Sequence, residues 1–170
     1  MLLNIIDIAS SMMRSVNKAV STMSGITFRE MPVVTNEPVP YFSVRGSKGT
    51  FISIMRFEQK DKKWTKGAIV IAISGEQIQK LFSKNYGITL GSPDDDIIDV
   101  CGEFCNVVAG GFKKELVVLG FGEQTIEVPE NHYKELSKNL DLVIHNKYQL
   151  VFNHEGTELL LAEVAMESQE

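Results

Sequence analysis

The longest predicted helix of the chain lies in residues 92–120, which read SPDDDIIDVCGEFCNVVAGGFKKELVVLG. Ser92 can cap the first turn through its hydroxyl, and Pro93 suits the first helical position because proline has no amide hydrogen to leave unpaired. The three aspartates that follow lie at the positive end of the helix dipole. The pattern predicts a helix that runs through Leu116 and stops near Gly120.

The two faces of this helix differ in polarity. At roughly 100° per residue, one broad face collects the apolar residues Ile97, Cys101, Phe104, Val108 and Phe112. Amphipathic packing predicts that this face lies in the core. Within an arc of about 80°, the opposite face carries Asp99, Glu103, Asn106, Gly110 and Lys113. A polar stripe is typical of any surface helix, so the stripe alone indicates only solvent exposure.

Glycine and asparagine make the stripe unusual. Gly102, Gly110 and Gly111 each cost about 1 kcal/mol relative to alanine in a helix interior, so we expect a close approach by a packed neighbouring element or by a partner. Asn106 is a poor helix former three residues after Glu103. Side chains at this spacing point the same way, so a carboxylate that can bind a cation lies beside a carboxamide that can hold a water. The surface expected to meet a partner consists of Gly102, Gly110 and Lys113.

The rest of the chain supplies a second long helix, a short helix and strands. Apolar residues recur at three- and four-residue steps over 2–23, and Gly25 is the expected stop. Ser74 and Gln77 suggest a capping box that opens a short helix ending at Gly87. The other predicted segments are a connecting loop or edge segment at 30–40, a hairpin of 41–45 and 50–57 around 46–49, a charged loop at 58–66, strands at 67–73 and 125–129, and a hairpin of 140–152 and 157–166 around 153–156.

Strands that follow one another by hairpins indicate an antiparallel sheet. The predicted fold class is therefore α+β, with two long helices layered on this sheet, rather than a doubly wound sheet. Residues 159–162, with the sequence Leu-Leu-Leu-Ala, put apolar side chains on both faces of a late strand. Such a strand is either central or an edge that needs covering, and an edge of this kind favours self-association of the chain.

Composition limits the class of protein. With 170 residues, of which 44% are apolar and 23% charged, the chain has the size and mixture of one folded domain rather than of a disordered segment. Its net charge of −5 argues against nucleic acid, because phosphate binding requires a basic face. Two cysteines are too few for a secreted disulfide framework, and neither a basic leader nor a membrane-length apolar run is present. We expect a cytoplasmic domain over 1–166, a frayed tail at 167–170, and neither nucleic acid nor membrane as partner.

Most sequence patterns of catalysis are absent. The chain has no GxxxxGK[ST], GxGxxG, GxSxG or HExxH motif, and the glycines of 46–50 suit a hairpin turn. Cys101 and Cys105 lack further ligands at metal-site spacing, so we expect them to pack in the core. The three histidines form no cluster, and the helix start is the simpler explanation of residues 94–96, with a cation site as the alternative. We expect neither a metal nor a cofactor in this chain.

The stripe nevertheless resembles a known family. The spacing Asp99-x3-Glu103-x2-Asn106-x22-Pro129 is similar to the (Asp or Ser)-x3-Glu-x2-Asn-x22-Pro signature of the CheC/CheX/FliY phosphatases, and residues 102–111 resemble the CheX-type helix. These proteins remove phosphate from the aspartyl phosphate of the CheY response regulator. The resemblance extends over the chain in length and order of elements, and it is sharpest over 99–129.

A fainter match lies near the N-terminus. The spacing Ser10-x3-Arg14-x2-Asn17-x22-Pro40 repeats the pattern with arginine in place of the required glutamate. CheC-type members resemble two such half-sites and CheX-type members keep one, so the chain resembles the CheX arrangement with a degenerate second site. The alternatives are an internal duplication and a chance match on an amphipathic helix.

The resemblance implies a mechanism. Asn106 would position the attacking water, as glutamine does in small GTPases, and Glu103 would pair with the receiver's active-site lysine. Asp99 and Pro129 would be supports, and Mg²⁺ would be held by the phosphorylated receiver domain. Two alternatives stay open: a non-catalytic module that binds a receiver or a flagellar-switch component, and an unrelated α+β domain.

Overall fold

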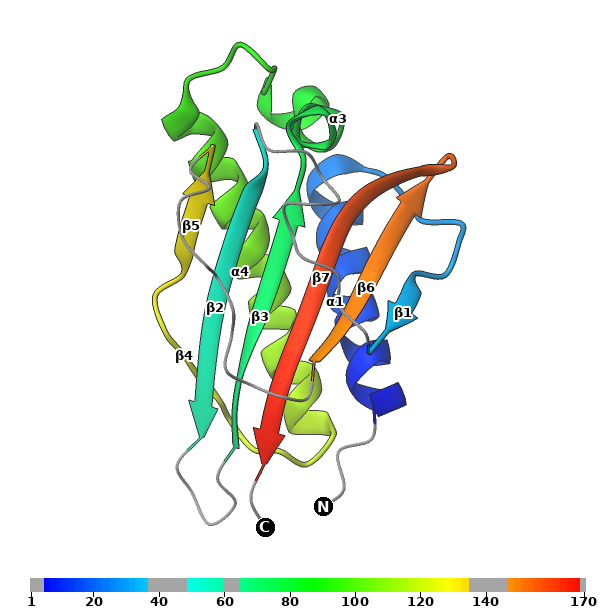
Figure 1. Cartoon of the computed structure of the whole chain (residues 1–170), viewed down its shortest axis with the longest axis vertical. Helices are drawn as coiled ribbons and strands as arrows, with labels where there is room; N and C mark the ends of the chain where they lie inside the picture. Colours follow the sequence, from blue (N-terminus) through cyan, green and yellow to red (C-terminus); the bar gives the residue numbers. More distant parts are fainter. Residues whose placement is uncertain (1–4, 37–48, 60–64, 135–146, 169–170) are drawn as a thin grey trace.

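The protein has the predicted α+β fold in a computed structural model that describes residues 5–36, 49–59, 65–134 and 147–168 (Figure 1). Three helices cover one face of an antiparallel sheet. The elements in chain order are α1 (Ile5–Ser24), β1 (Val33–Thr35), β2 (Phe51–Gln59), β3 (Thr65–Ile73), α3 (Gly75–Tyr86), α4 (Asp94–Val118), β4 (Thr125–Ile126), β5 (Glu130–Tyr133), β6 (Lys147–His154) and β7 (Thr157–Ser168).

The order of strands in the sheet is symmetric about its centre, with two halves of the same arrangement. The strands run β1-β6-β7-β3-β2-β4, and β5 pairs with the same edge of β2 as β4, but along residues 51–54 rather than 57–58. If the chain is divided into α1-β1-β2-β3 and α4-β4-β5-β6-β7, each half gives a central hairpin and an edge that pairs with the hairpin of the other half. This is the order that an internal duplication would produce.

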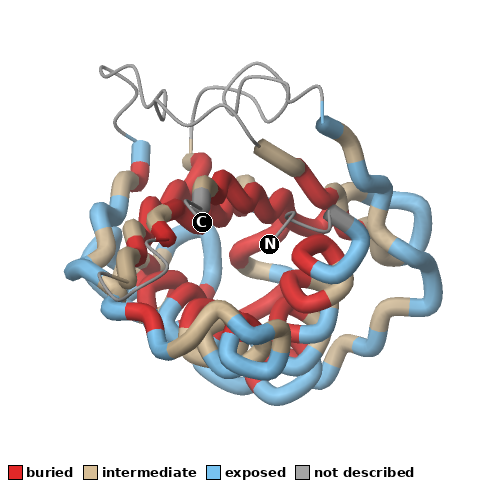
Figure 2. The backbone as a smooth tube through the Cα atoms, turned by 90° about the horizontal axis from the view of Figure 1, so that it is seen from below, coloured by how far each residue is buried: buried red, intermediate tan, exposed pale blue. Residues whose placement is uncertain are grey.

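The core lies between the sheet and the helices, where most buried residues gather (Figure 2). The predicted apolar face of α4 is confirmed, because its five residues are at most 1% exposed. They pack in one cluster with the helix-facing residues of the central strands and with the apolar face of α1. Burial of this stripe fixes the rotation of α4, and therefore turns its polar face away from the sheet.

The helix ends were predicted better than the helix starts. Glycine follows α1 and α3 directly, and Gly120 lies two residues after α4, as expected. At the start of α4, however, Pro93 rather than Ser92 is the N-cap, and the Ser92 hydroxyl accepts a hydrogen bond from the Thr89 amide at 2.8 Å. Ser74 is the N-cap of α3 but makes no side-chain capping bond. Both predicted capping bonds are therefore wrong.

Several strand boundaries also differ from the prediction. The expected loop at 58–66 is shorter, because Gln59 and Thr65 pair with each other in the β2–β3 ladder. The expected strand at 125–129 is reduced to β4, and β5 was not predicted, since its sequence Glu-Asn-His-Tyr lacks the alternation of a half-buried strand. Within residues 30–36, the described part of the expected connecting segment at 30–40, β1 is the one strand. The expected strand at 41–45 lies outside the described residues.

The last strand corrects two further expectations. Glu167 and Ser168 belong to β7 and pair with Lys66 and Thr65, so the fraying expected from 167 is wrong for these two residues. Residues 159–162 lie in β7 between β6 and β3. Their two apolar faces are therefore explained by a central position in the sheet, and they do not require a second copy to cover them.

Candidate active site

The polar stripe of α4 faces away from the sheet, as predicted. Asp99, Glu103 and Asn106 are exposed and follow one another at one-turn spacing. The helix backbone is open at Gly110, where an added Cβ would have no atom of a neighbouring described element within 4 Å. Lys113 is half-buried and lies 3.4 Å from a carboxylate oxygen of Glu123. A carboxylate and a carboxamide are thus presented together on an accessible helix surface.

Gly102 is approached by another part of the same chain rather than by a partner. Its predicted place on the surface that meets a partner is therefore corrected. Gly102 is buried, and a Cβ added there would lie 3.1 Å from Nδ2 of Asn131 on β5. Gly111 has a similar explanation, since an added Cβ would lie 3.4 Å from the Ser15 hydroxyl on α1. Two of the three glycines therefore serve packed neighbours, and Gly110 is the one that leaves open space.

A side-chain hydrogen bond joins Asn131 to a buried residue of β2. The Ser53 hydroxyl donates to Oδ1 of Asn131 at 2.7 Å. Burial raises the pKa of Cys105 to about 12, and burial raises the pKa of Cys101 as well. Because a thiolate is the reactive form, both cysteines are inert core residues, as the sequence indicated.

Pro129 acts at the start of β5. The preceding strand ends at Ile126 and Val128 is 88% exposed, so the strand expected over 125–129 does not reach Pro129. Proline suits the position before a strand because it has no amide hydrogen to donate to the ladder. Pro129 therefore precedes a strand that pairs with β2 and lies beside α4.

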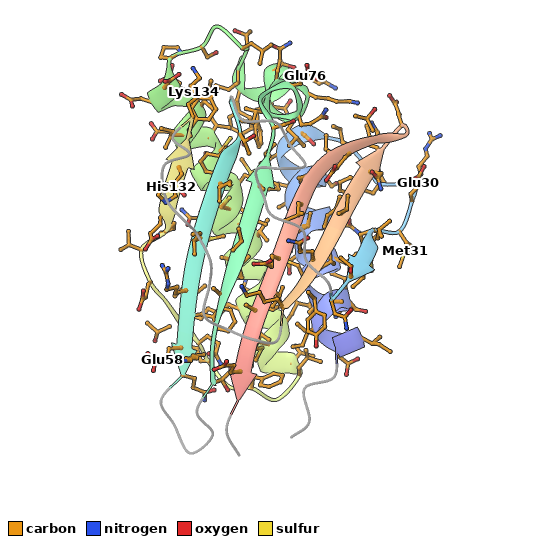
Figure 3. All side chains as sticks on the ribbon, viewed as in Figure 1. Glu30, Met31, Glu58, Glu76, His132 and Lys134 are labelled. Carbon is orange, nitrogen blue, oxygen red and sulfur yellow. The ribbon has the colours of Figure 1, made fainter. Side chains whose placement is uncertain are left out.

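An ion pair holds the far end of β5 against α4. Lys134 Nζ lies 2.8 Å from Asp94 Oδ1, at the beginning of the helix. Figure 3 labels Lys134 near that end and His132 farther along the same edge of the sheet. This hydrogen bond raises the pKa of Lys134. Asp94 thus has an internal partner in addition to its favourable place at the helix N-terminus.

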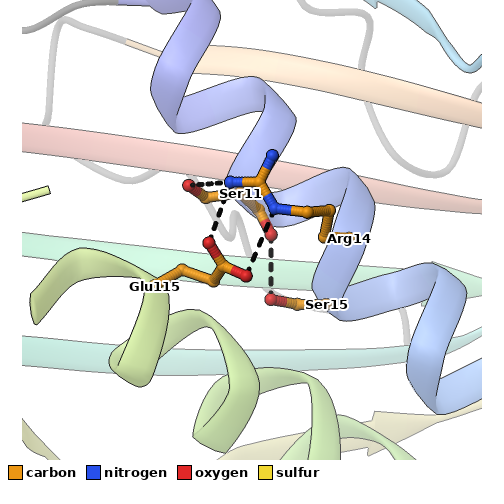
Figure 4. Close-up of polar contacts among 4 residues, drawn as sticks. All are labelled: Ser11, Arg14, Ser15 and Glu115. Carbon is orange, nitrogen blue, oxygen red and sulfur yellow. Dashed lines mark hydrogen bonds and ion pairs between the residues drawn. The ribbon is translucent and has the colours of Figure 1, made fainter. Parts of the chain in front are cut away.

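The N-terminal repeat of the motif forms an interhelical contact. Arg14 on α1 binds Glu115 on α4 through two hydrogen bonds, of 2.8 and 3.2 Å, and also donates to the Ser11 hydroxyl (Figure 4). Ser10 and Asn17 are half-buried. Pro40 lies outside the described residues. The degenerate site therefore lacks an acid, and its arginine is engaged within the protein.

Among the described residues, no group of three or more histidine, cysteine, aspartate or glutamate side chains could hold a metal ion. His132 lies 4.0 Å from Glu130 and His154 lies 3.7 Å from Glu155, each beside a near neighbour in sequence. None of the helices among the described residues is long and apolar enough to cross a membrane.

Comparison with solved structures defines the class of fold. Chemotaxis protein CheX from Vibrio vulnificus has a TM-score of 0.74 at 15% identity, covering 94% of this chain and 99% of that one. A CheC-like superfamily protein from Shewanella has a TM-score of 0.69 at 21% identity, covering 97% and 99%. The CheX–CheY–BeF3–Mg complex from Borrelia burgdorferi has a TM-score of 0.70 at 16% identity, covering 93% and 96%. The chain therefore has the CheX-like fold.

The family is established by sequence. The family model described as chemotaxis phosphatase CheX matches residues 58–149, which is more than half of the chain. A search among curated proteins found no match. The chain belongs to the CheX family of chemotaxis phosphatases.

Sequence reasoning missed Asn131 at this site. The motif ends at Pro129, two residues before it, and that spacing was the available signal. The contact between Asn131 and Gly102 joins residues far apart in the chain, so helix periodicity alone gave no indication of it.

Proposed function

We propose that this protein hydrolyses the aspartyl phosphate of a response-regulator receiver domain. The observation that carries the proposal is the exposure of Glu103 and Asn106 on one surface of α4, beside the open backbone at Gly110. The apolar face of the same helix is fully buried. The pair is therefore held on a rigid element that can enter a partner's active site, which suits a reaction that depends on positioning.

Asn106 holds the attacking water in line with the bond to be broken. Its carboxamide offers an acceptor oxygen and an NH₂ donor, which together orient one water molecule. The water oxygen bonds to phosphorus, and the bond between phosphorus and the receiver's aspartyl oxygen breaks. The products are inorganic phosphate and the free aspartate carboxylate, and the water loses its proton to phosphate or solvent. This is positioning catalysis without a covalent intermediate on this chain.

Glu103 anchors the helix by pairing with the receiver's active-site lysine. The carboxylate is exposed and lies one turn from Asn106, so one approach of the helix brings both groups to the phosphate. Asp99 supports this surface from the preceding turn, and Pro129 supports it through the start of β5. Mg²⁺ is held by the receiver and offsets the charge of the phosphoryl oxygens.

The Borrelia relative supports this choice of partner, because it was crystallised with CheY, BeF3 and Mg. A non-catalytic receiver-binding module is the second candidate. Such a module would need Glu103 for contact but has no use for a water-positioning amide at Asn106. The proposed setting is the cytoplasm, where receiver domains are found.

A homodimer is part of the proposal. The edge strand β1 exposes Val33 and Val34, which are 60% and 46% exposed, in a sheet edge that a second copy could extend. Mass measurement in solution tests this association. A monomer at the concentrations used for activity would contradict it without affecting the assignment of Glu103 and Asn106.

The lifetime of a phosphorylated receiver tests the function. Wild-type protein should shorten that lifetime in the presence of Mg²⁺, whereas Asn106→Ala should bind the receiver and leave its lifetime close to the spontaneous value. Asn36→Ala, an exposed change beyond β1, is the control. Equal acceleration by wild type and Asn106→Ala would overturn the assignment, and binding without acceleration by wild type would favour the non-catalytic module.

A further inference from the structure

Asn131 places a second carboxamide beside the proposed catalytic one. It comes from β5, at the register position opposite Ser53 on β2, and its Nδ2 would lie 3.1 Å from a Cβ added at Gly102. A glycine at 102 is therefore what allows this amide to lie against α4. Any larger residue there would require the amide to move, because the available separation from an added Cβ is 3.1 Å.

The Asn106 side chain is also directed toward Gly102. Side chains on a helix lean toward its N-terminus, so a residue covers the turn that precedes its own Cα. For Asn106, the residues one turn back are Gly102 and Glu103. Helix geometry therefore directs the Asn106 side chain toward Gly102, the residue that Nδ2 of Asn131 also approaches.

The orientation of the Asn131 amide is fixed from below. Its Oδ1 accepts the hydrogen bond from the Ser53 hydroxyl, and Ser53 is fully buried. With the oxygen end occupied, the NH₂ end is the one that lies over Gly102. The NH₂ group can donate two hydrogen bonds, and no described residue accepts one from it within hydrogen-bond distance.

We propose that Asn131 is a positioning residue that donates from Nδ2 to Oδ1 of Asn106 when the receiver docks. This inference rests on the proposed function. Oδ1 has two acceptor lone pairs, so one accepts the Asn131 donor and the other accepts the attacking water. The contact selects one of the two flipped orientations of the Asn106 amide, which keeps its oxygen toward the water.

Asn131→Asp tests this role with little change of shape. The carboxylate retains an acceptor for Ser53 but has no NH₂, so it attracts the NH₂ of Asn106 and turns Oδ1 away from the water. We expect kcat for receiver dephosphorylation to fall about 10- to 100-fold, with KM and the affinity for a beryllofluoride-activated receiver unchanged. Asn36→Asp adds the same charge beyond the opposite edge of the sheet and should retain wild-type kcat.

Ser53→Ala provides a second test because it leaves all atoms of Asn131 in place. Loss of the fixing hydrogen bond should lower kcat in the same direction by a smaller factor, again without a change in KM. Wild-type kcat in Asn131→Asp would overturn the inference, as would a fall in receiver affinity that accounts for the whole loss of activity. If Asn131→Asp does not fold, as judged by thermal unfolding, unchanged kcat in Ser53→Ala overturns it.

The two proposals fail in different ways. If wild-type protein does not dephosphorylate any receiver, or if Asn106→Ala is as active as wild type, the proposed function is wrong and this inference is wrong with it. If Asn106→Ala is inactive while Asn131→Asp is fully active, the proposed function stands and only the role of Asn131 is overturned.

Discussion

The helices α1 and α4 occupy equivalent places in a fold with a symmetric strand order, yet their polar faces differ. On α4 the motif positions Glu103 and Asn106 are exposed. On α1 the corresponding positions hold Arg14, which binds Glu115 across the helix interface, and Asn17, which is half-buried. The same spacing thus gives an accessible pair on one helix and an interhelical contact on the other.

This difference shows what a motif requires in order to act on a partner. A group that has an internal hydrogen-bond partner must lose that bond before it can bind another molecule. Arg14 has such a partner, whereas Glu103 forms no ion pair with another described residue. The acid at this position is therefore needed both for its charge and for its freedom from the neighbouring helix.

The largest expected effect is a difference in dephosphorylation rate between variants of Asn106 on α4 and of Asn17 on α1. Asn106→Ala should lower the rate of receiver dephosphorylation by roughly 10²–10³, because it removes a preorganised group that orients the reacting water. Its stability should change little, since the side chain is exposed. Asn17→Ala, the same change at the corresponding position of α1, should keep a rate within about twofold of wild type. Phosphate release under single-turnover conditions measures both.

A similar loss of dephosphorylation rate in both variants would contradict this difference between the helices, because it would mean that the residues of α1 also contribute to the reaction. Thermal unfolding of each variant is the control. A rate loss in Asn17→Ala that follows a fall in stability would report damage to the fold and would leave the distinction between the helices intact.

The next effect concerns binding. Glu103→Ala should lower kcat/KM about 10- to 100-fold, since a hydrogen bond to a charged group contributes about 1.5–3 kcal/mol. Much of the loss should be in affinity for the receiver, and added salt should narrow the gap between variant and wild type. Arg14→Ala is the matched change on α1 and should leave kcat/KM unaltered. Loss of affinity in Arg14→Ala but not in Glu103→Ala would reverse the assignment of the two helices.

Much of this fold could be predicted because long amphipathic segments carry a strong periodic signal. The rotation of α4, and hence the exposure of Glu103 and Asn106, follows from the apolar positions such as Phe104 and Val108. Composition and periodicity did not predict the function. The spacing of the motif predicted the CheX-type family, and the match of the family model confirms that family.

The features that could not be predicted depend on contacts between distant residues. The strand β5 is four residues long and forms because Ser53 and its neighbours on β2 offer it a pairing edge. Gly102 was read as an approach surface for a partner because its actual neighbour, Asn131, is remote in sequence. The capping hydrogen bond predicted for Ser92 is absent for a related reason. The Ser92 hydroxyl instead accepts a hydrogen bond from the Thr89 amide in the preceding turn.

A smaller effect, on stability and on receiver binding, is expected from a change at Gly110 of α4. Gly110→Ala should stabilise the protein by about 0.4–1 kcal/mol, because an added methyl group meets no atom within 4 Å and alanine is the better helix former. If the receiver approaches the backbone there, the same variant should bind it more weakly. Chemical denaturation and receiver binding measure the two effects. Gain of stability with unchanged binding would show that the receiver does not contact this position.

The smallest effect is a pH dependence of the contact between Arg14 and Glu115. The hydrogen bonds from Arg14 hold the pKa of Glu115 below its ordinary value. A carboxylate with a lowered pKa contributes stability that is present above its ordinary pKa, 4.5, and is lost as the pH falls through the lowered value. The Arg14 and Glu115 side chains are 51% and 27% exposed, so the contribution should be less than about 1 kcal/mol. Wild type should therefore exceed Arg14→Gln in unfolding free energy above pH 5, and the difference should shrink below pH 4. A difference that stays constant over this range would mean that Arg14 stabilises α1 through the packing of its side chain rather than through the charge of Glu115.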